Sequence, residues 1–279
     1  MVVGSKKRFW SKCGLAAGLA VLLIWSVAPV YWIVVTALKT EKEIYDYPPT
    51  FFPTTVTLEQ YATILWHSQF PLFIRNSAIV AVVCTLITAI VALLAAYAIT
   101  RMQFVGRAMV ARLIVVAYLL PPSLLFIPLF LVLQRLGLVD ALGGLVLAYL
   151  TFTVPFATWM LIGHIRTIPS ELDEAARIDG ASRLQVLLRI IVPVALPGIA
   201  VVALFAFTQA WNEFLYALVF VYNNSARTIT AGLASLMMGD VFIWGQLMAA
   251  STLAIVPVLL VYLVAQKYLI EGLTGGSVK

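Results

Sequence analysis

The chain has 279 residues, of which 63% are hydrophobic and only 11% are charged. A folded domain in water needs more charged surface than eighteen Lys/Arg and twelve Asp/Glu residues provide, so the mean hydropathy of +1.03 excludes a water-soluble protein. The net charge of +6 is then a signal of membrane topology, and we expect no nucleic-acid partner.

Six apolar runs are long enough to cross a lipid bilayer, which takes roughly 20 residues of helix. Each run is continuously apolar rather than alternating with polar residues, and this favours helices over barrel strands. The predicted spans are about 13–38, 76–100, 113–134, 141–165, 194–222 and 246–266. The sequence therefore predicts an all-α membrane protein with six transmembrane helices in one domain, 1–279.

The first span begins like a secretory signal, with basic residues before an apolar run, but the run is too long for a cleaved signal and indicates an uncleaved span. With the N-terminus in the cytoplasm, thirteen Lys/Arg fall on inner segments and five on outer ones. Because Lys and Arg concentrate on the cytoplasmic side, we expect both termini there. Residues 39–72 then lie outside, where three prolines and a helix start at 57–59 predict an ordered lid.

The cysteines and histidines predict no disulfide and no metal site. Cys13 and Cys84 lie inside different predicted spans at different depths, so both are expected to serve packing. Neither His67 nor His164 has a second histidine or an acid at metal-ligand spacing.

A polar segment at 166–193 interrupts the apolar pattern on the cytoplasmic side. Ser170 is expected to cap a short helix whose first turn is acidic, and Leu172, Ala175 and Ala176 share one face of it. The sequence Asp179-Gly180 is expected to stop that helix, because glycine adopts the left-handed backbone that ends many helices.

A second short helix is expected immediately after the glycine. Ser182 and Gln185 have the spacing of a capping box, and the helix would return to the membrane at Pro193. From the residues alone, two interpretations stay open: the segment is a plug for a groove in a soluble partner, or a turn that folds back along the helix bundle.

The order Glu174-Ala175-Ala176, three residues, Gly180, nine residues, Ile190, one residue, Val192-Pro193 resembles the EAA signature of binding-protein-dependent ABC importer permeases. Valine stands at 192 where leucine is usual. The stretches ALKTEKEIYDYPPTFFP, TLEQYATIL, RNS, WNEFLYAL and EGLTGGSVK are similar to the maltose-type sugar permeases, so the resemblance covers nearly the whole chain.

The resemblance implies a type I importer permease bundle whose polar segment forms coupling helices. It also implies a homologous second permease subunit, two ATPase subunits, an extracytoplasmic solute-binding protein and a sugar substrate, in the cell membrane of a bacterium or archaeon. The residues implied in ATPase coupling are Glu174, Ala175, Ala176, Asp179, Gly180 and Ser182.

The chain lacks a GxxxxGK[ST] phosphate-binding loop, so we expect a transport subunit that is not an enzyme and binds no cofactor. ATP and Mg²⁺ would be used by the partner ATPase. Two alternatives stay open: a permease for a non-sugar solute such as glycerol phosphate, and a stand-alone secondary transporter. The second is disfavoured because only one acid lies at membrane depth.

That acid is Glu213, which follows Trp211 and Asn212 in the fifth predicted span. An acid within the bilayer should face protein or a water-filled cavity, and aromatic and hydrogen-bonding groups together suit sugars. The three residues are therefore candidates for the substrate pathway. The alternative is that Asn212 and Glu213 stabilise a helix break or a contact between subunits, with the sugar bound mainly by the second permease.

Overall fold

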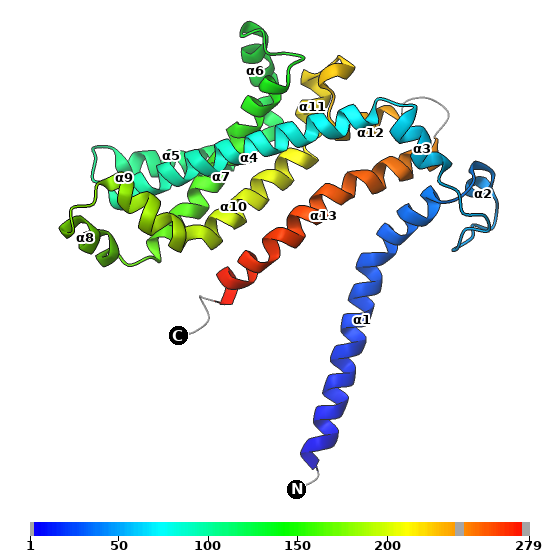
Figure 1. The fold of residues 1–279 in the computed structure, drawn as a ribbon, viewed down its shortest axis with the longest axis horizontal. Coiled ribbons are helices and arrows are strands. Elements are labelled where there is room, and N and C mark those ends of the chain that lie inside the picture. Colours follow the sequence, from blue (N-terminus) through cyan, green and yellow to red (C-terminus); the bar gives the residue numbers. More distant parts are fainter. Residues whose placement is uncertain (1–2, 238–242, 275–279) are drawn as a thin grey trace. The chain divides into compact units, whose positions relative to one another are not determined.

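The computed structural model describes residues 3–237 and 243–274, and within these ranges every regular element is a helix. In chain order they are α1 (Val3–Ala37), α2 (Glu41–Tyr45), α3 (Glu59–Trp66), α4 (Phe70–Arg101), α5 (Arg107–Leu119), α6 (Pro122–Arg135), α7 (Leu142–Arg166), α8 (Glu171–Ile178), α9 (Arg183–Val186), η1 (Leu187–Ile191), α10 (Val192–Asn212), α11 (Leu215–Phe220), η2 (Asn224–Ala226), α12 (Ile229–Ser235) and α13 (Trp244–Thr274) (Figure 1). The prediction of an all-α protein is confirmed.

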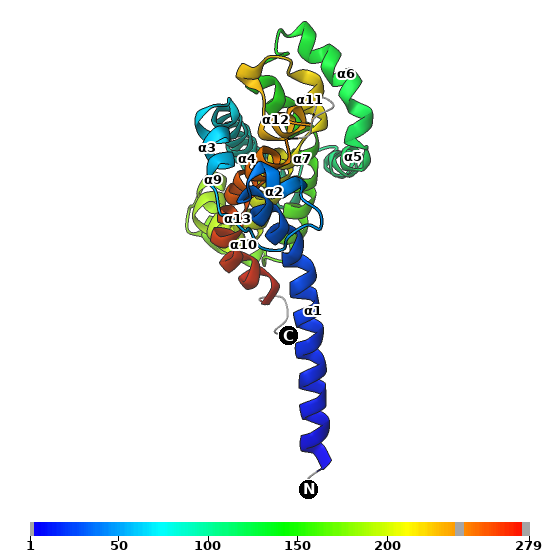
Figure 2. The ribbon, with the colours of Figure 1, turned by 90° about the vertical axis from the view of Figure 1, so that its right-hand side faces the viewer.

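Within the described ranges, five segments are helical, long and apolar enough to cross a membrane. They are Lys12–Ala37, Phe70–Arg101, Leu142–Arg166, Arg183–Asn212 and Trp244–Tyr268. A sixth span is present if α5 and α6 count together, but they meet at an angle of 101°. The expected span 113–134 is therefore bent, and Figure 2 shows α6 turning away from α5.

Two adjacent prolines cause this bend. A residue that precedes proline is pushed into extended backbone, and both Leu120 (ψ 124°) and Pro121 (ψ 124°) have it. Pro122 then begins α6, where its missing N–H costs nothing because the first turn of a helix has no intrahelical acceptor for it.

By internal contacts the chain divides into two compact units. One comprises Met1–Gln69 and Leu233–Ile255, and the other comprises Phe70–Gly232 and Val256–Lys279. In the first unit, Thr57 N–H donates to Leu38 O (2.9 Å), and the carboxylate of Glu43 accepts from Thr50 Oγ1 and Thr54 N–H, both at 2.8 Å. These hydrogen bonds, that of Thr54 first, lower the pKa of Glu43 and order the segment that follows α1.

In the second unit, α4, α7 and α10 pack against one another and α5 packs on α7 (Figure 1). Fully buried alanines, among them Ala92, Ala96 and Ala157, let the helix backbones approach closely, as small residues do in membrane bundles. Between α4 and α7, the hydroxyls of Thr88 and Thr153 share a hydrogen bond of 2.8 Å. Cys84 is buried beside them as a free thiol, and Cys13 is free and exposed.

Candidate functional site

The polar segment folds into two short helices, α8 and α9, that meet at Gly180. We call residues 169–192, which join α7 to α10, the elbow. Gly180 has φ +86°, in the left-handed region, as its sequence position predicted. Its N–H donates to Arg177 O (3.1 Å) and the N–H of Ala181 donates to Ala176 O (3.0 Å), which is the Schellman pattern that ends a helix.

The second helix of the elbow begins with the predicted capping box. Ser182 Oγ accepts from Gln185 N–H (3.4 Å), and Gln185 Oε1 accepts from Ser182 N–H (2.7 Å). The predicted cap at Ser170 is wrong, because its side chain makes no capping hydrogen bond. Ser170 has helical backbone angles (φ −69°, ψ −21°), whereas a capping side chain reaches the first amides from extended backbone.

The three residues expected to share one face of α8 differ in their exposure. Asp173 and Ala176 are buried, whereas Leu172 and Ala175, which were expected to share a face with Ala176, are exposed. The two alanines of the EAA signature thus have different surroundings. Ala176 allows α8 to lie close to the helix bundle, and Ala175 belongs to the outer face.

Large apolar side chains are also exposed on this outer face of the elbow. Ile178 is 87% exposed at the end of α8 and Leu184 is 60% exposed on α9. Glu174, Asp179 and Gly180 are exposed around them. The elbow therefore carries apolar and charged groups together on a surface that the rest of the chain does not cover.

The inner side of the elbow belongs to the main core. Ala176, Val186, Leu187 and Ile191 form one buried cluster with residues of α4, α7 and α10. Because close-packed protein interiors transmit displacements rather than absorb them, the elbow is a rigid extension of these three helices.

The elbow ends in a π-helical turn, η1, that leads into α10. The N–H of Val192 donates to Leu187 O, five residues back, and the next residue, Pro193, has no N–H to donate. Such turns inside longer helices occur mostly at functional sites. The Ile190…Val192-Pro193 end of the EAA signature coincides with this irregular turn.

Sequence reasoning missed a residue that holds α8 in place, Arg101 at the C-terminus of α4. Its Nε lies 2.8 Å from Asp173 Oδ2, and its Nη2 donates to Ile165 O (3.3 Å) and Ile168 O (2.5 Å). Burial raises the pKa of Asp173, and Arg101 opposes this shift. The sequence signal was the arginine that ends the charge-free run of the second span, which we had counted only for topology.

The second candidate group lies where α10 ends and α11 begins. Trp211 is buried and stacks on Phe207 with ring centroids 5.7 Å apart, and Asn212 is exposed. The carboxylate of Glu213 accepts from the N–H groups of Tyr216 (2.9 Å) and Ala217 (3.1 Å). Glu213 therefore caps α11 and supports the helix break, so the fifth predicted span is not one continuous helix.

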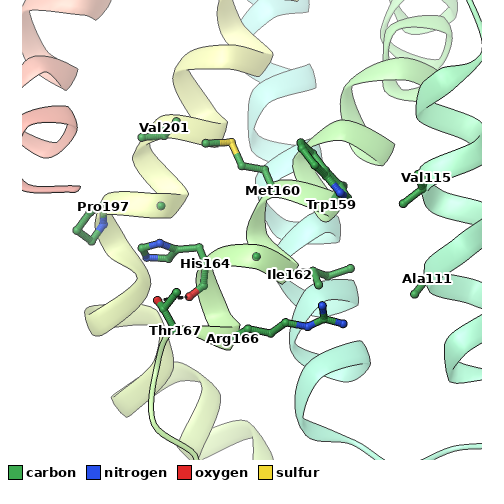
Figure 3. Close-up of a pocket in the computed structure, with 12 residues that line it drawn as sticks. Ala111, Val115, Trp159, Met160, Ile162, His164, Arg166, Thr167, Pro197 and Val201 are labelled. Atoms are coloured by element: carbon green, nitrogen blue, oxygen red, sulfur yellow. Dashed lines mark hydrogen bonds between the residues drawn. The ribbon is translucent and has the colours of Figure 1, made fainter. Parts of the chain in front are cut away.

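A cavity of about 680 Å³ lies between α5, α7 and α10 (Figure 3). It is lined mainly by apolar side chains, with Trp159 and His164 of α7 facing it, and contains none of the nine residues predicted from the sequence. The His164 ring lies against Gly198, where a Cβ would come within 2.4 Å of His164 Cδ2. Among the described side chains, no group of three His, Cys, Asp or Glu residues could hold a metal ion.

An all-helical membrane bundle that presents a glycine-centred elbow between two spans is the architecture of an importer permease. The chain belongs to the family of binding-protein-dependent transport system inner membrane components, whose model matches residues 89–275. It is thus a multi-pass membrane protein and a transport subunit.

Relatives match over nearly the full chain. It is 36% identical over 279 residues to the inner membrane ABC transporter permease protein YcjP of Escherichia coli K12, covering 99% of this chain and 100% of that one. It is 35% identical to the sulfoquinovosyl glycerol permease SmoH of Agrobacterium fabrum (93% and 91% covered). It is 34% identical to the trehalose/maltose permease MalG of Thermococcus litoralis (95% and 96% covered).

Among solved structures, the fold matches a chain of a bacterial ABC transporter involved in import of the acidic polysaccharide alginate. The TM-score is 0.78, with 22% identity and coverage of 95% of this chain and 98% of that one. This match confirms the predicted importer permease fold.

Proposed function

We propose that this chain is the permease subunit of an ATP-driven sugar importer and that its elbow couples the membrane helices to a separate ATPase. The observation that carries the proposal is the elbow itself. Its inner side is built into the core, whereas its outer side exposes Ala175, Ile178 and Leu184 among charged residues. Apolar anchors within a charged rim are the composition of a protein docking surface.

The transport cycle proposed is alternating access. ATP and Mg²⁺ bind to two ATPase subunits, whose closure moves the elbow and switches the pathway formed with a homologous second permease. An extracytoplasmic solute-binding protein delivers the sugar, and both termini of this chain face the cytoplasm. The class of solute is supported by the two relatives named for trehalose/maltose and for sulfoquinovosyl glycerol.

The proposed coupling residues have different tasks. Glu174, Ala175 and Asp179 meet the ATPase, while Ala176, Gly180 and Ser182 give the elbow its shape. Trp211, Asn212 and Glu213 remain our candidates for the pathway, with Glu213 shaping the helix break and the exposed Asn212 available to the solute.

The test is co-purification with the ATPase that is encoded with the chain, together with uptake in vesicles. Ile178→Asp places a charge at the most exposed apolar position of the elbow and should abolish both ATPase retention and uptake. The matched control is Val105→Asp, which changes a fully exposed valine in the turn after α4 and should leave both intact. Normal ATPase retention by Ile178→Asp, or uptake by the chain without any ATPase, contradicts the proposal.

A further inference from the structure

The C-terminal turns of α4 contact both arms of the elbow. Tyr97 and Arg101 are four residues apart and so share one face of α4. Arg101 reaches Asp173 in the first turn of α8, and the hydroxyl of Tyr97 lies 3.5 Å from the carbonyl oxygen of Arg183, the first residue of α9. The C-terminal end of α4 thus contacts the elbow both before and after Gly180 in the sequence.

The guanidinium of Arg101 lies between the ends of two helices. It donates to the carbonyl oxygens of Ile165 and Ile168, at the C-terminal end of α7 and just beyond it, and it pairs with an acid at the N-terminal end of α8. Both placements are electrostatically favourable, because a cation suits the C-terminus of a helix and an anion its N-terminus. The planar fork of arginine can meet these acceptors together, which a single ammonium group cannot do.

This pair is an expensive way to stabilise a fold. The side chains of Arg101 and Asp173 are only 13% and 11% exposed, and taking two charges out of water offsets much of their attraction. Apolar side chains of similar size at these positions would hold α8 to the bundle at least as strongly. What the ion pair adds is a defined position, because it ties Asp173 of α8 to the same guanidinium that donates to Ile165 O and Ile168 O at the end of α7.

We propose that Arg101 is a positioning residue for energy coupling: through Asp173 and the end of α7 it sets the orientation of α8 and makes the elbow and α4 move together. The inference rests on the proposed function of the elbow as the ATPase joint. It adds that α4 is one of the membrane helices through which movement of the ATPase reaches the bundle, and that Arg101 makes this link.

The experiment uses the assembled transporter in vesicles and measures three quantities: ATPase retained per permease, ATP hydrolysed and sugar taken up. Arg101→Met should retain the ATPase, because Ala176 and the other residues of the core cluster still hold the elbow, but lower uptake per ATP by about tenfold or more, because α8 no longer directs α4. Arg101→Lys keeps the charge and should fall between. The matched control is Arg107→Met. It changes an exposed arginine at the start of α5 whose Nη1 donates to Met102 O nearby, and it should behave as wild type.

A pH profile separates positioning from a general loss of stability. In Arg101→Met the buried Asp173 loses its counter-ion while Glu174 and Tyr97 still face it, so its pKa rises further and uptake should recover towards acidic pH. Adding Asp173→Asn to this variant should abolish the pH shift and recover part of the coupling at neutral pH. The charge exchange Arg101→Asp with Asp173→Arg should be more active than either single change.

The outcomes distinguish this inference from the proposed function. If Arg101→Met retains the ATPase and keeps the wild-type uptake per ATP, the positioning role is wrong even though the elbow still docks. If Arg101→Met and Arg101→Lys lose coupling equally with no pH shift, the residue serves only general packing, and the inference is also wrong. If Ile178→Asp keeps the ATPase, the docking proposal itself fails.

Discussion

Substituting Gly180 tests how much of the elbow's action depends on its backbone shape. A residue with a side chain at φ +86° is strained by about 1–2 kcal/mol. No heavy atom lies within 4 Å of a Cβ built at this position, so Gly180→Ala meets no steric obstacle within the chain. Within the chain, the effect of alanine is therefore this strain, which disfavours the observed backbone geometry of the elbow about five- to thirtyfold.

Comparing Gly180→Ala with Gly180→Leu separates strain from docking. Both carry the same backbone strain, but only leucine projects a bulky group from the exposed side of the elbow. We expect alanine to lower uptake per ATP about five- to thirtyfold with the ATPase retained, and leucine to abolish coupling while the permease remains in the membrane. Gly180→Asn should be milder than alanine, because asparagine tolerates the left-handed conformation.

The control is Gly106→Ala, since Gly106 also has a positive φ (85°) with no atom within 4 Å of its Cβ position, but lies in the turn before α5. It carries the same strain outside the elbow and should lower the midpoint of thermal unfolding without uncoupling ATP hydrolysis from uptake. Wild-type uptake per ATP by Gly180→Leu would refute the reasoning, as would equal uncoupling by Gly106→Ala.

Three further predictions concern polar groups away from the elbow. Glu213→Ala removes the cap of α11 and should cost about 1–2 kcal/mol of stability, measured as a lower midpoint of thermal unfolding. Sugar uptake should fall more than the amount of assembled complex does. Uptake per assembled complex equal to that of the wild type would exclude a role of Glu213 in transport. Because the pKa of Glu43 is lowered in the folded chain, its stabilisation of residues 38–58 is present above its unfolded pKa and is lost as pH falls through the lower folded pKa. Hydrogen exchange of that segment should rise at acidic pH, and a Glu43→Gln variant should show no such titration. Asn76→Ala leaves the carbonyl groups of Ser225 and Arg227 without their donor at a fully buried site and should cost about 1–3 kcal/mol in thermal unfolding; an unchanged midpoint contradicts this.

The sequence predicted best those features that neighbouring residues determine. The spans followed from continuous hydropathy, and the elbow followed from Gly180 and the Ser182–Gln185 pair, whose geometry is local. Prolines tend to kink a helix, but the size of the bend between α5 and α6 could not be predicted, because two prolines do not change the length or hydropathy of an apolar run. The helix break at Glu213 had been weighed, but its geometry depends on which backbone amides the carboxylate can reach.

The inward face of α8 could not be predicted because it depends on a residue distant in sequence. Apolar periodicity favoured Leu172, Ala175 and Ala176 together, whereas Arg101 draws Asp173 inward and turns the helix about its axis. A charge that pairs across the fold thus overrides the hydrophobic pattern of a helix only eight residues long.

Helix α4 is fastened at both of its ends. Near its start, Asn76 and Ser77 hold the backbone of residues 225–229, and at its finish Tyr97 and Arg101 hold the elbow. With 32 residues at about 1.5 Å each, it is a lever of about 48 Å, so a tilt of about 5° about one end carries the other end about 4 Å sideways. A stroke of that size is close to the diameter of a side chain, which means that a small rotation is enough to change which side chains meet along its flank.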